Sequence, residues 1–265
     1  TKKKEVKETP ITVIKALKQG VVTKMSQGCS ERFVKDVKRI VILWERYESE
    51  QHIKNLTLDN LQSSHIRKFL VRPNWSAKTQ HTIKSTLSPL LAEFKPNLVQ
   101  SVKLKKPTST LHKPFDNINE ILESIKTYNN PLYLCCLMTY GCLLRPHREI
   151  RELTWGDFSD DLKHINLSGN RNKSGRNRIV PVPLYIRDIL VKGEPNNNIF
   201  SNKPKPFNID YFKTLWSRFK KQSDILEQGQ TLYSFRHSGA IEIFKRTGSL
   251  TKLQKAMGHS SLNVS

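Results

Sequence analysis

The stretch LYSFRHSGAIEIFKRTGSLTKLQKAMGHSSLNVS, residues 232–265, decides the fold and the function that we predict for this chain. Its apolar residues recur at helical spacing, and the pair Arg236-His237 opens the helical pattern while the pair Gly258-His259 closes it. Taken alone, such an Arg-His pair is most often a surface charge beside a core histidine. The meaning of this stretch therefore depends on the charge and the motifs of the remaining chain.

Charge is the strongest property of the composition. The 265 residues include 45 Lys and Arg against 23 Asp and Glu, which gives a formal net charge of +22. An excess of this size predicts a polyanionic partner, and nucleic acid is the first candidate because neutralised phosphates release counterions. A membrane surface is the alternative. No apolar run reaches the roughly 18–20 residues that span a bilayer, and no basic amphipathic helix with exposed aromatics supports membrane binding. We expect double-stranded DNA as the partner and no membrane.

The four cysteines are expected to be reduced core residues. Cys135, Cys136 and Cys142 lie in one apolar stretch, and their spacing fits neither a zinc site nor the disulfide framework of a secreted protein. No signal peptide is recognisable, so we expect a cytoplasmic protein. The sequence starts at Thr1 rather than at a methionine, and we expect it to be a portion of a longer chain.

The pattern along the chain predicts two domains. Apolar residues at three- and four-residue steps, such as Val37, Val41 and Trp44, predict a helical core DNA-binding domain over residues 1–95. Residues 96–114 have little periodicity and contain four lysines, which is typical of a basic linker. Residues 115–265 form the second domain.

The second domain is predicted to mix helices with a small antiparallel sheet. Residues 164–167 and 178–182 alternate like strands, and the polar run between them suits a hairpin turn. Helical patterns flank this hairpin over residues 115–128, 132–144, 184–191, 209–221, 238–246 and 250–257. The fold class is therefore α+β and mainly helical.

Four polar motifs follow one another in this domain. They are Leu144-Arg145-Pro146-His147-Arg148-Glu149, the hairpin run with Lys173, Tyr233-Ser234-Phe235-Arg236-His237, and Met257-Gly258-His259. This series resembles the tyrosine recombinase (phage integrase) family. That family has an Arg box, a hairpin Lys, a His-x-x-Arg box and a Leu-Gly-His box, followed by a nucleophilic Tyr. Each motif is weak by itself, but four of them in this order are specific.

The resemblance implies a C-shaped DNA clamp and an enzyme that cuts and rejoins DNA through a 3′-phosphotyrosyl intermediate, in integration or excision of a mobile element. Arg145 and Arg236 would clamp the oxygens of the scissile phosphate. Lys173 would protonate the leaving 5′ oxygen, and His259 would donate a hydrogen bond to the phosphate. Tyr233 would assist proton handling. The chemistry needs no metal, cofactor or ATP, and the resemblance places the protein with bacterial, phage or other mobile-element DNA at the nucleoid.

The chain departs from the family pattern in three places. Arg145 and Glu149 are four residues apart where three is usual, so either one residue is inserted or Arg148 has taken the clamp role. We favour Arg145 because its neighbours match the family better. Tyr233 stands where His is usual and is a poorer base, since its reference pKa is about 10. The nucleophilic Tyr is expected about nine residues after His259, beyond Ser265, and we expect the sequence as given to be inactive without it.

Some of these residues have plain structural alternatives. Lys173 shares its turn with Arg171 and Arg176, where a solvated charge run is the default. Glu149 is expected to orient an arginine rather than to act as an acid catalyst. His237 is expected to face the core.

Residues that contact DNA are predicted in three regions. A helix that starts near Ser76 presents polar side chains from its first turns, which can enter a major groove. Basic residues of the linker, of the hairpin end and of the segment before residue 209 are expected to touch phosphates. The full set is Lys78, Thr79, Gln80, His81, Lys84, Lys103, Lys105, Lys106, Arg176, Arg178, Lys203 and Lys205.

Two other functions share most of these features. A catalytically inactive relative would bind DNA as a regulator, and a type IB topoisomerase would run the same chemistry on one duplex. A recombinase, by contrast, would assemble on DNA as a dimer to a tetramer.

Overall fold

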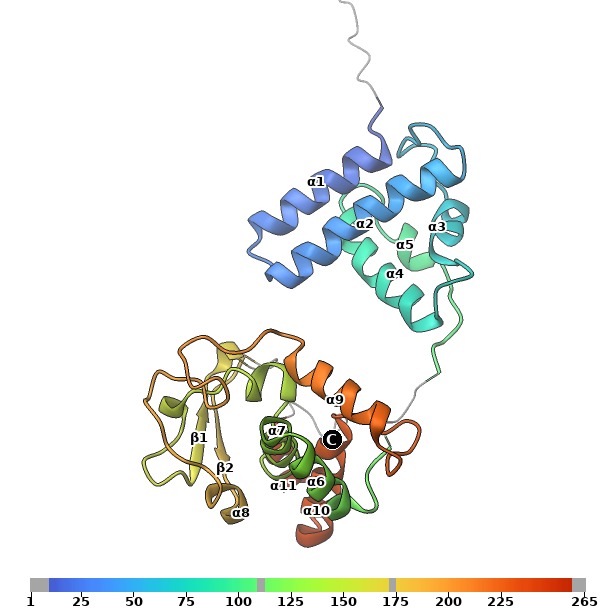
Figure 1. Ribbon diagram of the computed structural model, residues 1–265. Coiled ribbons are helices and arrows are strands. Elements are labelled where there is room, and N and C mark those ends of the chain that lie inside the picture. The colour runs from blue at the N-terminus through green and yellow to red at the C-terminus, as the bar shows by residue number, and fades with distance from the viewer. Residues whose placement is uncertain (1–9, 109–112, 172–174, 259–265) are drawn as a thin grey trace, which may run out of the picture. The chain divides into compact units, whose positions relative to one another are not determined.

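The computed structural model describes residues 10–108, 113–171 and 175–258 (Figure 1). The chain divides into two compact units, Thr1–Thr110 and Leu111–Ser265. Each unit has its own apolar core. The division falls inside the segment predicted as the basic linker. None of the helices in the described ranges is long and apolar enough to cross a membrane.

The described part of the first unit is built from helices. They are α1 (Val13–Ser26), α2 (Glu31–Glu50), α3 (Ser63–Leu70), α4 (Ala77–Leu91) and α5 (Leu98–Ser101). Serine side chains start two of them: Ser30 accepts from the Phe33 amide and Ser76 from the Thr79 amide, which satisfies amides that have no partner inside the helix. The apolar faces meet around Trp44 and Phe69, which are fully buried.

The start of the predicted linker belongs to the first unit. Short helix α5 lies there, and Val99 and Val102 are buried in the first core. Periodicity did not reveal this helix because a single turn shows no repeat. The lysines that follow, at 103, 105 and 106, are exposed.

The second unit combines helices with one hairpin. Its elements are α6 (Ile118–Tyr128), α7 (Asn130–Gly141), the π-helical turn η1 (Pro146–Ile150), the 3-10 turn η2 (Trp155–Asp157), β1 (His164–Leu167), the 3-10 turn η3 (Gly169–Arg171), β2 (Arg178–Pro181), α8 (Leu184–Arg187), α9 (Tyr211–Gln222), α10 (Ser234–Thr247) and α11 (Leu250–Met257). This composition confirms the predicted mainly helical α+β class.

The predicted sheet is a two-stranded antiparallel hairpin. Its register runs from His164 opposite Pro181 to Leu167 opposite Arg178. Ile165, Leu167 and Val180 point into the core, while the residues between them are exposed. The alternation of apolar and polar residues therefore set the buried face, as the sequence predicted.

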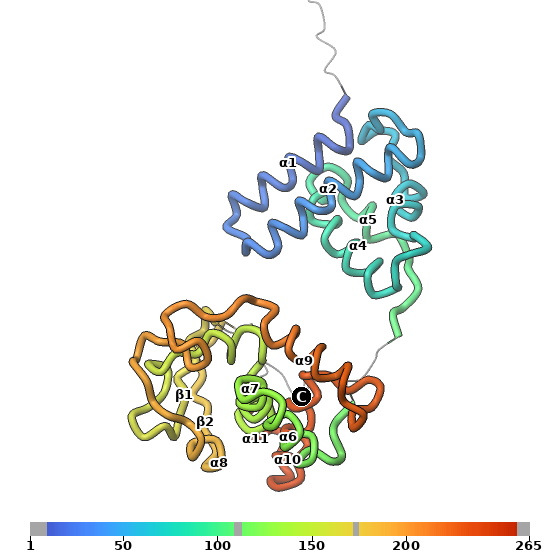
Figure 2. The backbone as a smooth tube through the Cα atoms, in the orientation of Figure 1, coloured from blue at the N-terminus to red at the C-terminus, as the bar shows by residue number. Residues whose placement is uncertain are grey.

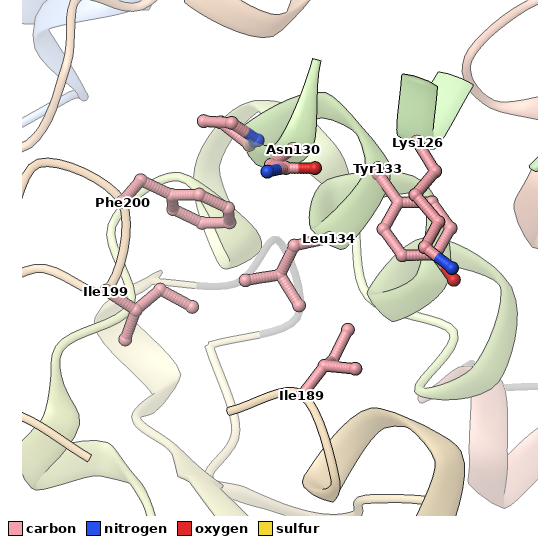
Figure 3. A pocket seen from close by; sticks show the side chains of 8 residues that line it. Lys126, Asn130, Tyr133, Leu134, Ile189, Ile199 and Phe200 are labelled. Atoms are coloured by element: carbon pink, nitrogen blue, oxygen red, sulfur yellow. The ribbon is translucent and has the colours of Figure 1, made fainter. Parts of the chain in front are cut away.

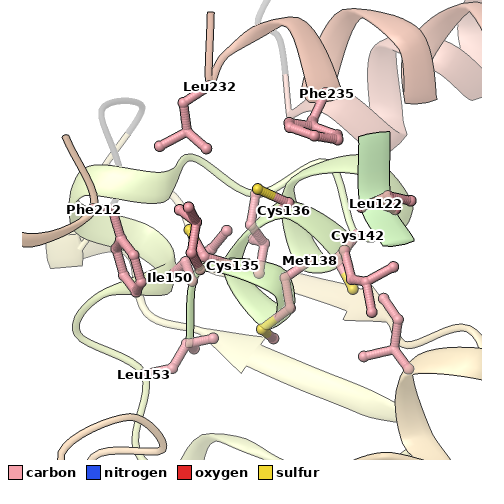
Figure 4. Packing of buried hydrophobic residues seen from close by; sticks show 14 of the residues in the cluster. Leu122, Cys135, Cys136, Met138, Cys142, Ile150, Leu153, Phe212, Leu232 and Phe235 are labelled. Carbon is pink, nitrogen blue, oxygen red and sulfur yellow. The ribbon is translucent and has the colours of Figure 1, made fainter. Parts of the chain in front are cut away.

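Helix α7 forms the centre of the second unit. It is apolar on all sides and packs against α6 and α10 (Figures 1 and 2). Cys135, Cys136 and Met138 are buried in the same apolar cluster as Phe235 (Figure 4). Burial raises the pKa of the Cys142 thiol to about 12, so this cysteine stays protonated at neutral pH and fills space as an apolar residue.

A close crossing of α7 and α10 places the functional residues of α10. At Gly239 a side chain would overlap the carbonyl oxygen of Tyr140 at the end of α7. Glycine therefore lets the two helices approach to backbone contact. This contact lies one turn after Arg236, and it fixes where that arginine sits.

Candidate functional site

Arg236 is the central side chain of the candidate site. It lies in the first turn of α10, which begins at Ser234 and not at Ser238 as predicted. The side chain is fully buried, and Nη2 donates to the carbonyl of Met257 at 2.7 Å. Nε and Nη1 have no hydrogen-bond partner among the described residues. Buried donors of a charged group are costly when they are unpaired, so these two nitrogens point to a ligand that accepts hydrogen bonds.

Arg145 is held by a local turn that explains its unusual spacing to Glu149. Leu143 has a positive φ of 51°, and the next residues form the π-helical turn η1, in which the Ile150 amide donates to the Arg145 carbonyl at 3.0 Å. A π turn accommodates one extra residue per turn. The Glu149 carboxylate therefore still reaches back, accepting from the Arg145 amide at 2.9 Å and from the Arg145 guanidinium.

Arg148 lies outside the cluster formed by Arg145, Glu149 and Arg236. Its side chain is exposed, donates to the carbonyl of Asn170 at 2.7 Å and pairs with Glu152 at 3.7 Å. Arg145, in contrast, is close enough to Arg236 for its charge to lower the pKa of Arg236. Of the two arginines that the sequence left open, Arg145 is the one beside Arg236.

Arg178 also belongs to the cluster, although it was predicted to contact DNA. It starts β2, and its side chain is only 14% exposed. Nη1 donates to the Met257 carbonyl at 3.0 Å and Nη2 to Glu149 Oε2 at 3.4 Å. The sequence did contain a signal for this position: Arg178 shares strand parity with Val180 and Val182, which are buried.

Tyr233 borders Arg145 and Arg236. It is the residue before α10, its ring centroid lies 6.0 Å from the Arg236 Cζ atom, and its ring meets that of His237 edge to face. Burial lowers the pKa of Arg145, but the Glu149 carboxylate and a hydrogen bond to Tyr233 raise it above the ordinary value. The Tyr233 phenol thus lies beside both arginines, and its predicted part in proton handling stays a prediction.

Positive charge dominates the site. Three guanidinium groups surround one buried carboxylate, Glu149, in the part that the structure describes. Burial lowers the pKa of Arg236 to about 10; Tyr233 and Glu149 raise it, and Arg145 and Arg178 lower it. The arginine remains charged at neutral pH and is incompletely neutralised. The arrangement can therefore bind an oxyanion with several charge-assisted hydrogen bonds.

The end of α11 completes the described site. Leu253 and Met257 pack against Leu143 and Ala240, which fixes α11 beside α10. Gly258 ends the helix with a φ of 65°, the left-handed conformation common at helix ends. His259 follows directly and lies outside the described residues, so its predicted role stays a prediction.

Lys173 also lies outside the described residues, but the base of its turn is described. Arg171 makes a two-pronged contact with Asp157, with Nη1 at 2.6 Å from Oδ2, and donates to the carbonyl of Glu152. Arg171 is thus committed to anchoring the hairpin. Arg176 is exposed.

The predicted DNA-contacting residues of α4 occupy different environments. Lys78 and Thr79 are exposed in its first turn, whereas Gln80 donates to the carbonyl of Trp75 at 3.1 Å. Lys84 donates to the carbonyls of Gln100 and Val102, and His81 lies 3.1 Å from the carbonyl oxygen of Lys105. Lys78 is the best placed for a ligand, since the other four side chains have contacts within their own unit, Thr79 with the Ser76 hydroxyl. Lys203 and Lys205, in the second unit, are exposed.

The second unit also contains a pocket that lies apart from the predicted site residues. The pocket, of about 380 Å³, is lined mainly by apolar side chains, among them Leu134, Ile189 and Phe200, together with Lys126 and Asn130 (Figure 3). It contains none of the predicted site residues. Within the described ranges, no group of three or more His, Cys, Asp and Glu could hold a metal ion.

Known proteins resemble this chain both in sequence and in fold. A sequence model of the phage integrase family matches residues 113–265. The Tn1549 transposon integrase (residues 82–397), in complex with a circular intermediate DNA, has a TM-score of 0.70 at 15% identity, covering 96% of this chain and 93% of that one. A lambda integrase (75–356) dimer bound to a COC′ core site gives 0.78 at 18% identity, covering 96% and 97%.

A third similar structure is the site-specific recombinase XerH bound to a palindromic difH substrate, with a TM-score of 0.68 at 17% identity over 94% of this chain and 78% of that one. No curated protein sequence matches. The structural likeness extends over both units.

Proposed function

The chain belongs to the phage integrase family and is a site-specific tyrosine recombinase, and we propose that it integrates or excises a mobile element. DNA strands would be cut through a 3′-phosphotyrosyl intermediate and then rejoined. The observation that carries the proposal is the buried arginine cluster, with unpaired Arg236 donors and a surplus of positive charge. A phosphodiester supplies the missing negative charge and the acceptor oxygens.

The described residues would act on the phosphate and not on the nucleophile. Arg236 Nε and Nη1 would donate to the non-bridging oxygens, and Arg145, oriented by Glu149, would bind them as well. Tyr233 would support Arg145. The tyrosine hydroxyl would lose its proton to water as its oxygen attacks phosphorus in line, and the bond between phosphorus and the 5′ oxygen would break. The leaving 5′ oxygen takes up a proton, for which Lys173 is the predicted donor. The reverse attack by a 5′ hydroxyl rejoins the strand, so that no external energy is needed.

The partner and the assembly follow from the charge and from the relatives. A net charge of +22 favours binding to DNA phosphates. The similar lambda integrase has been seen as a tetramer bound to a Holliday junction as well as a dimer on a core site. We infer that this protein also assembles on DNA, from a dimer to a tetramer at synapsis, and works in the cytoplasm at nucleoid DNA.

Covalent trapping in cells tests this function. Protein-linked DNA is precipitated under denaturing conditions from cells that make the full-length protein, and the attached DNA is sequenced. We expect attachment at discrete sites, through the 3′ phosphate, and its loss when the predicted downstream tyrosine is changed to phenylalanine.

Each alternative gives a different result in this experiment. A type IB topoisomerase would attach throughout the DNA and relax supercoils without regard to sequence. An inactive DNA-binding relative would give no covalent DNA at all.

The charge argument predicts a steep salt dependence of DNA binding. If the protein neutralises about 6–10 phosphates, its affinity for duplex DNA should fall by about 10³-fold or more between 50 and 200 mM salt. Replacing Lys103, Lys105 and Lys106 with alanine should reduce the slope of log K against log salt by up to about three. Fluorescence anisotropy with a labelled duplex measures both, and a flat salt response would contradict the argument.

A further inference from the structure

Arg178 joins three parts of the candidate site that are distant in the sequence. It starts β2, contacts Glu149 in η1 and contacts the last carbonyl of α11. We infer that Arg178 is a positioning residue for DNA cleavage, which holds Arg145, Arg236 and the end of α11 in one arrangement. This inference rests on the proposed recombinase function.

The first connection is a shared acceptor. The Met257 carbonyl accepts from Arg178 Nη1 at 3.0 Å and from Arg236 Nη2 at 2.7 Å. Two like-charged groups are thus held around one oxygen, at the helix end where carbonyls lack partners and carry the negative end of the helix dipole. Loss of Arg178 leaves Arg236 as the side chain that holds this carbonyl.

The second connection passes through Glu149. Its Oε2 atom accepts from the Arg145 amide at 2.9 Å and lies 3.4 Å from Arg178 Nη2, while Oε1 accepts from the Arg145 guanidinium. Glu149 is 1% exposed, so it has little water with which to replace a lost partner. Removing Arg178 would therefore change the hydrogen bonding of the carboxylate that orients Arg145.

The third connection is steric. The Arg178 guanidinium lies against Gly258: a side-chain carbon at that position would overlap Nη1 and would approach Cδ to 3.2 Å and Cζ to 3.3 Å. Gly258 thus provides both the left-handed helix end and the space for Arg178. The arginine in turn holds the backbone immediately before His259.

Arg178 differs from Arg236 in what it can offer a phosphate. Both terminal nitrogens of Arg178 are used inside the protein and only its Nε lacks a partner in the described residues, while Arg236 lacks a partner there at both Nε and Nη1. A two-point contact with phosphate is therefore available to Arg236 but not to Arg178. Arg178 should affect the cleavage rate without adding to the phosphate contacts.

A matched pair of glycines tests this inference. Gly248 ends α10 with a φ of 60°, as Gly258 ends α11 with a φ of 65°, but no atom of the described residues lies within 4 Å of a side-chain carbon added at Gly248. Gly258→Ala and Gly248→Ala introduce a similar backbone strain, because both positions have the left-handed conformation. We expect only Gly258→Ala to slow covalent attachment to DNA, by about 100-fold, with DNA binding unchanged within about twofold.

A double-mutant cycle shows whether this effect passes through Arg178. Arg178→Ala should itself slow attachment by about 100-fold, and adding Gly258→Ala should cost little more, because the overlap is gone. A rate loss in the double variant equal to the product of the two single losses would overturn the inference. So would an Arg178→Ala variant that attaches as fast as the wild type. Thermal unfolding checks that each variant is folded. If Arg178→Ala does not fold, the comparison of Gly258→Ala with Gly248→Ala decides the test.

The salt dependence of binding separates positioning from direct phosphate contact. Arg178→Ala should leave the slope of log K against log salt unchanged, and a slope smaller by about one would identify a phosphate contact and overturn the inference. Wild-type protein that forms no covalent complex would overturn the proposed function and this inference together. A wild type that attaches normally beside an equally fast Arg178→Ala variant removes only the inference.

Discussion

Replacing Arg236 with lysine in the full-length protein is expected to reduce the rate of covalent attachment to DNA by about 100-fold or more, with DNA affinity nearly unchanged. Lysine keeps the charge but lacks the planar fork of donors that a phosphate accepts from arginine. Removing one donor of this kind typically costs about 10²–10³ in rate. Arg236→Ala, which loses every donor, is expected to abolish attachment.

The structure provides the physical reason for so large an effect. Arg236 is fully buried, and two of its nitrogens find no acceptor in the described protein. The site is thus prearranged for an oxyanion that is present only when DNA is bound. Other surfaces of the protein carry most of the charge, so that affinity depends little on this one arginine.

Arg246 is a suitable control for this measurement. It lies in the same helix, is 75% exposed and pairs with Glu242 one turn away. Arg246→Lys should leave the attachment rate within about twofold, since exposed pairs of this type contribute well under 1 kcal/mol. Single-turnover attachment and equilibrium binding are measured on the same duplex. An Arg236→Lys variant with wild-type attachment would contradict the assigned role.

Arg145 and Arg148 should differ sharply when each is replaced with alanine. Arg145→Ala should slow attachment by about 100-fold or more, because it removes a guanidinium that Glu149 holds in the cluster. Arg148→Ala should cost less than about fivefold, because it removes exposed contacts to Asn170 and Glu152. Single-turnover attachment on the same duplex measures both. The opposite ranking would mean that Arg148 had taken the clamp role.

Much of the fold was predictable because its causes are local. Apolar residues at helical spacing around Val37 and Trp44 set the buried face of α2, and alternation around Ile165 and Val180 set that of the hairpin. The start of α10 was not predictable in this way. Tyr233 precedes the helix without a side-chain cap, while the Ser234 hydroxyl accepts from the Thr231 amide. The usual capping signal is absent from the sequence there.

The candidate site was predictable in part. The types and the order of Arg145, Arg236 and the Gly258 turn follow from the motifs, and the structure places these residues together. The burial of Arg178 was missed, because a charged residue near a polar turn is ordinarily solvated. Its acceptors, Glu149 and the Met257 carbonyl, lie far from it in the chain.

The sequence by itself therefore determined which chemical groups this recombinase carries and in what order, because side-chain types, spacing and charge are written along the chain. Only the tertiary structure decided which arginines meet. A π turn accommodates the one-residue excess between Arg145 and Glu149. The carbonyl at the end of α11 accepts hydrogen bonds from both Arg178 and Arg236. The π turn is local, but the second outcome depends on the packing of distant segments, which brings acceptors to donors that no local pattern connects.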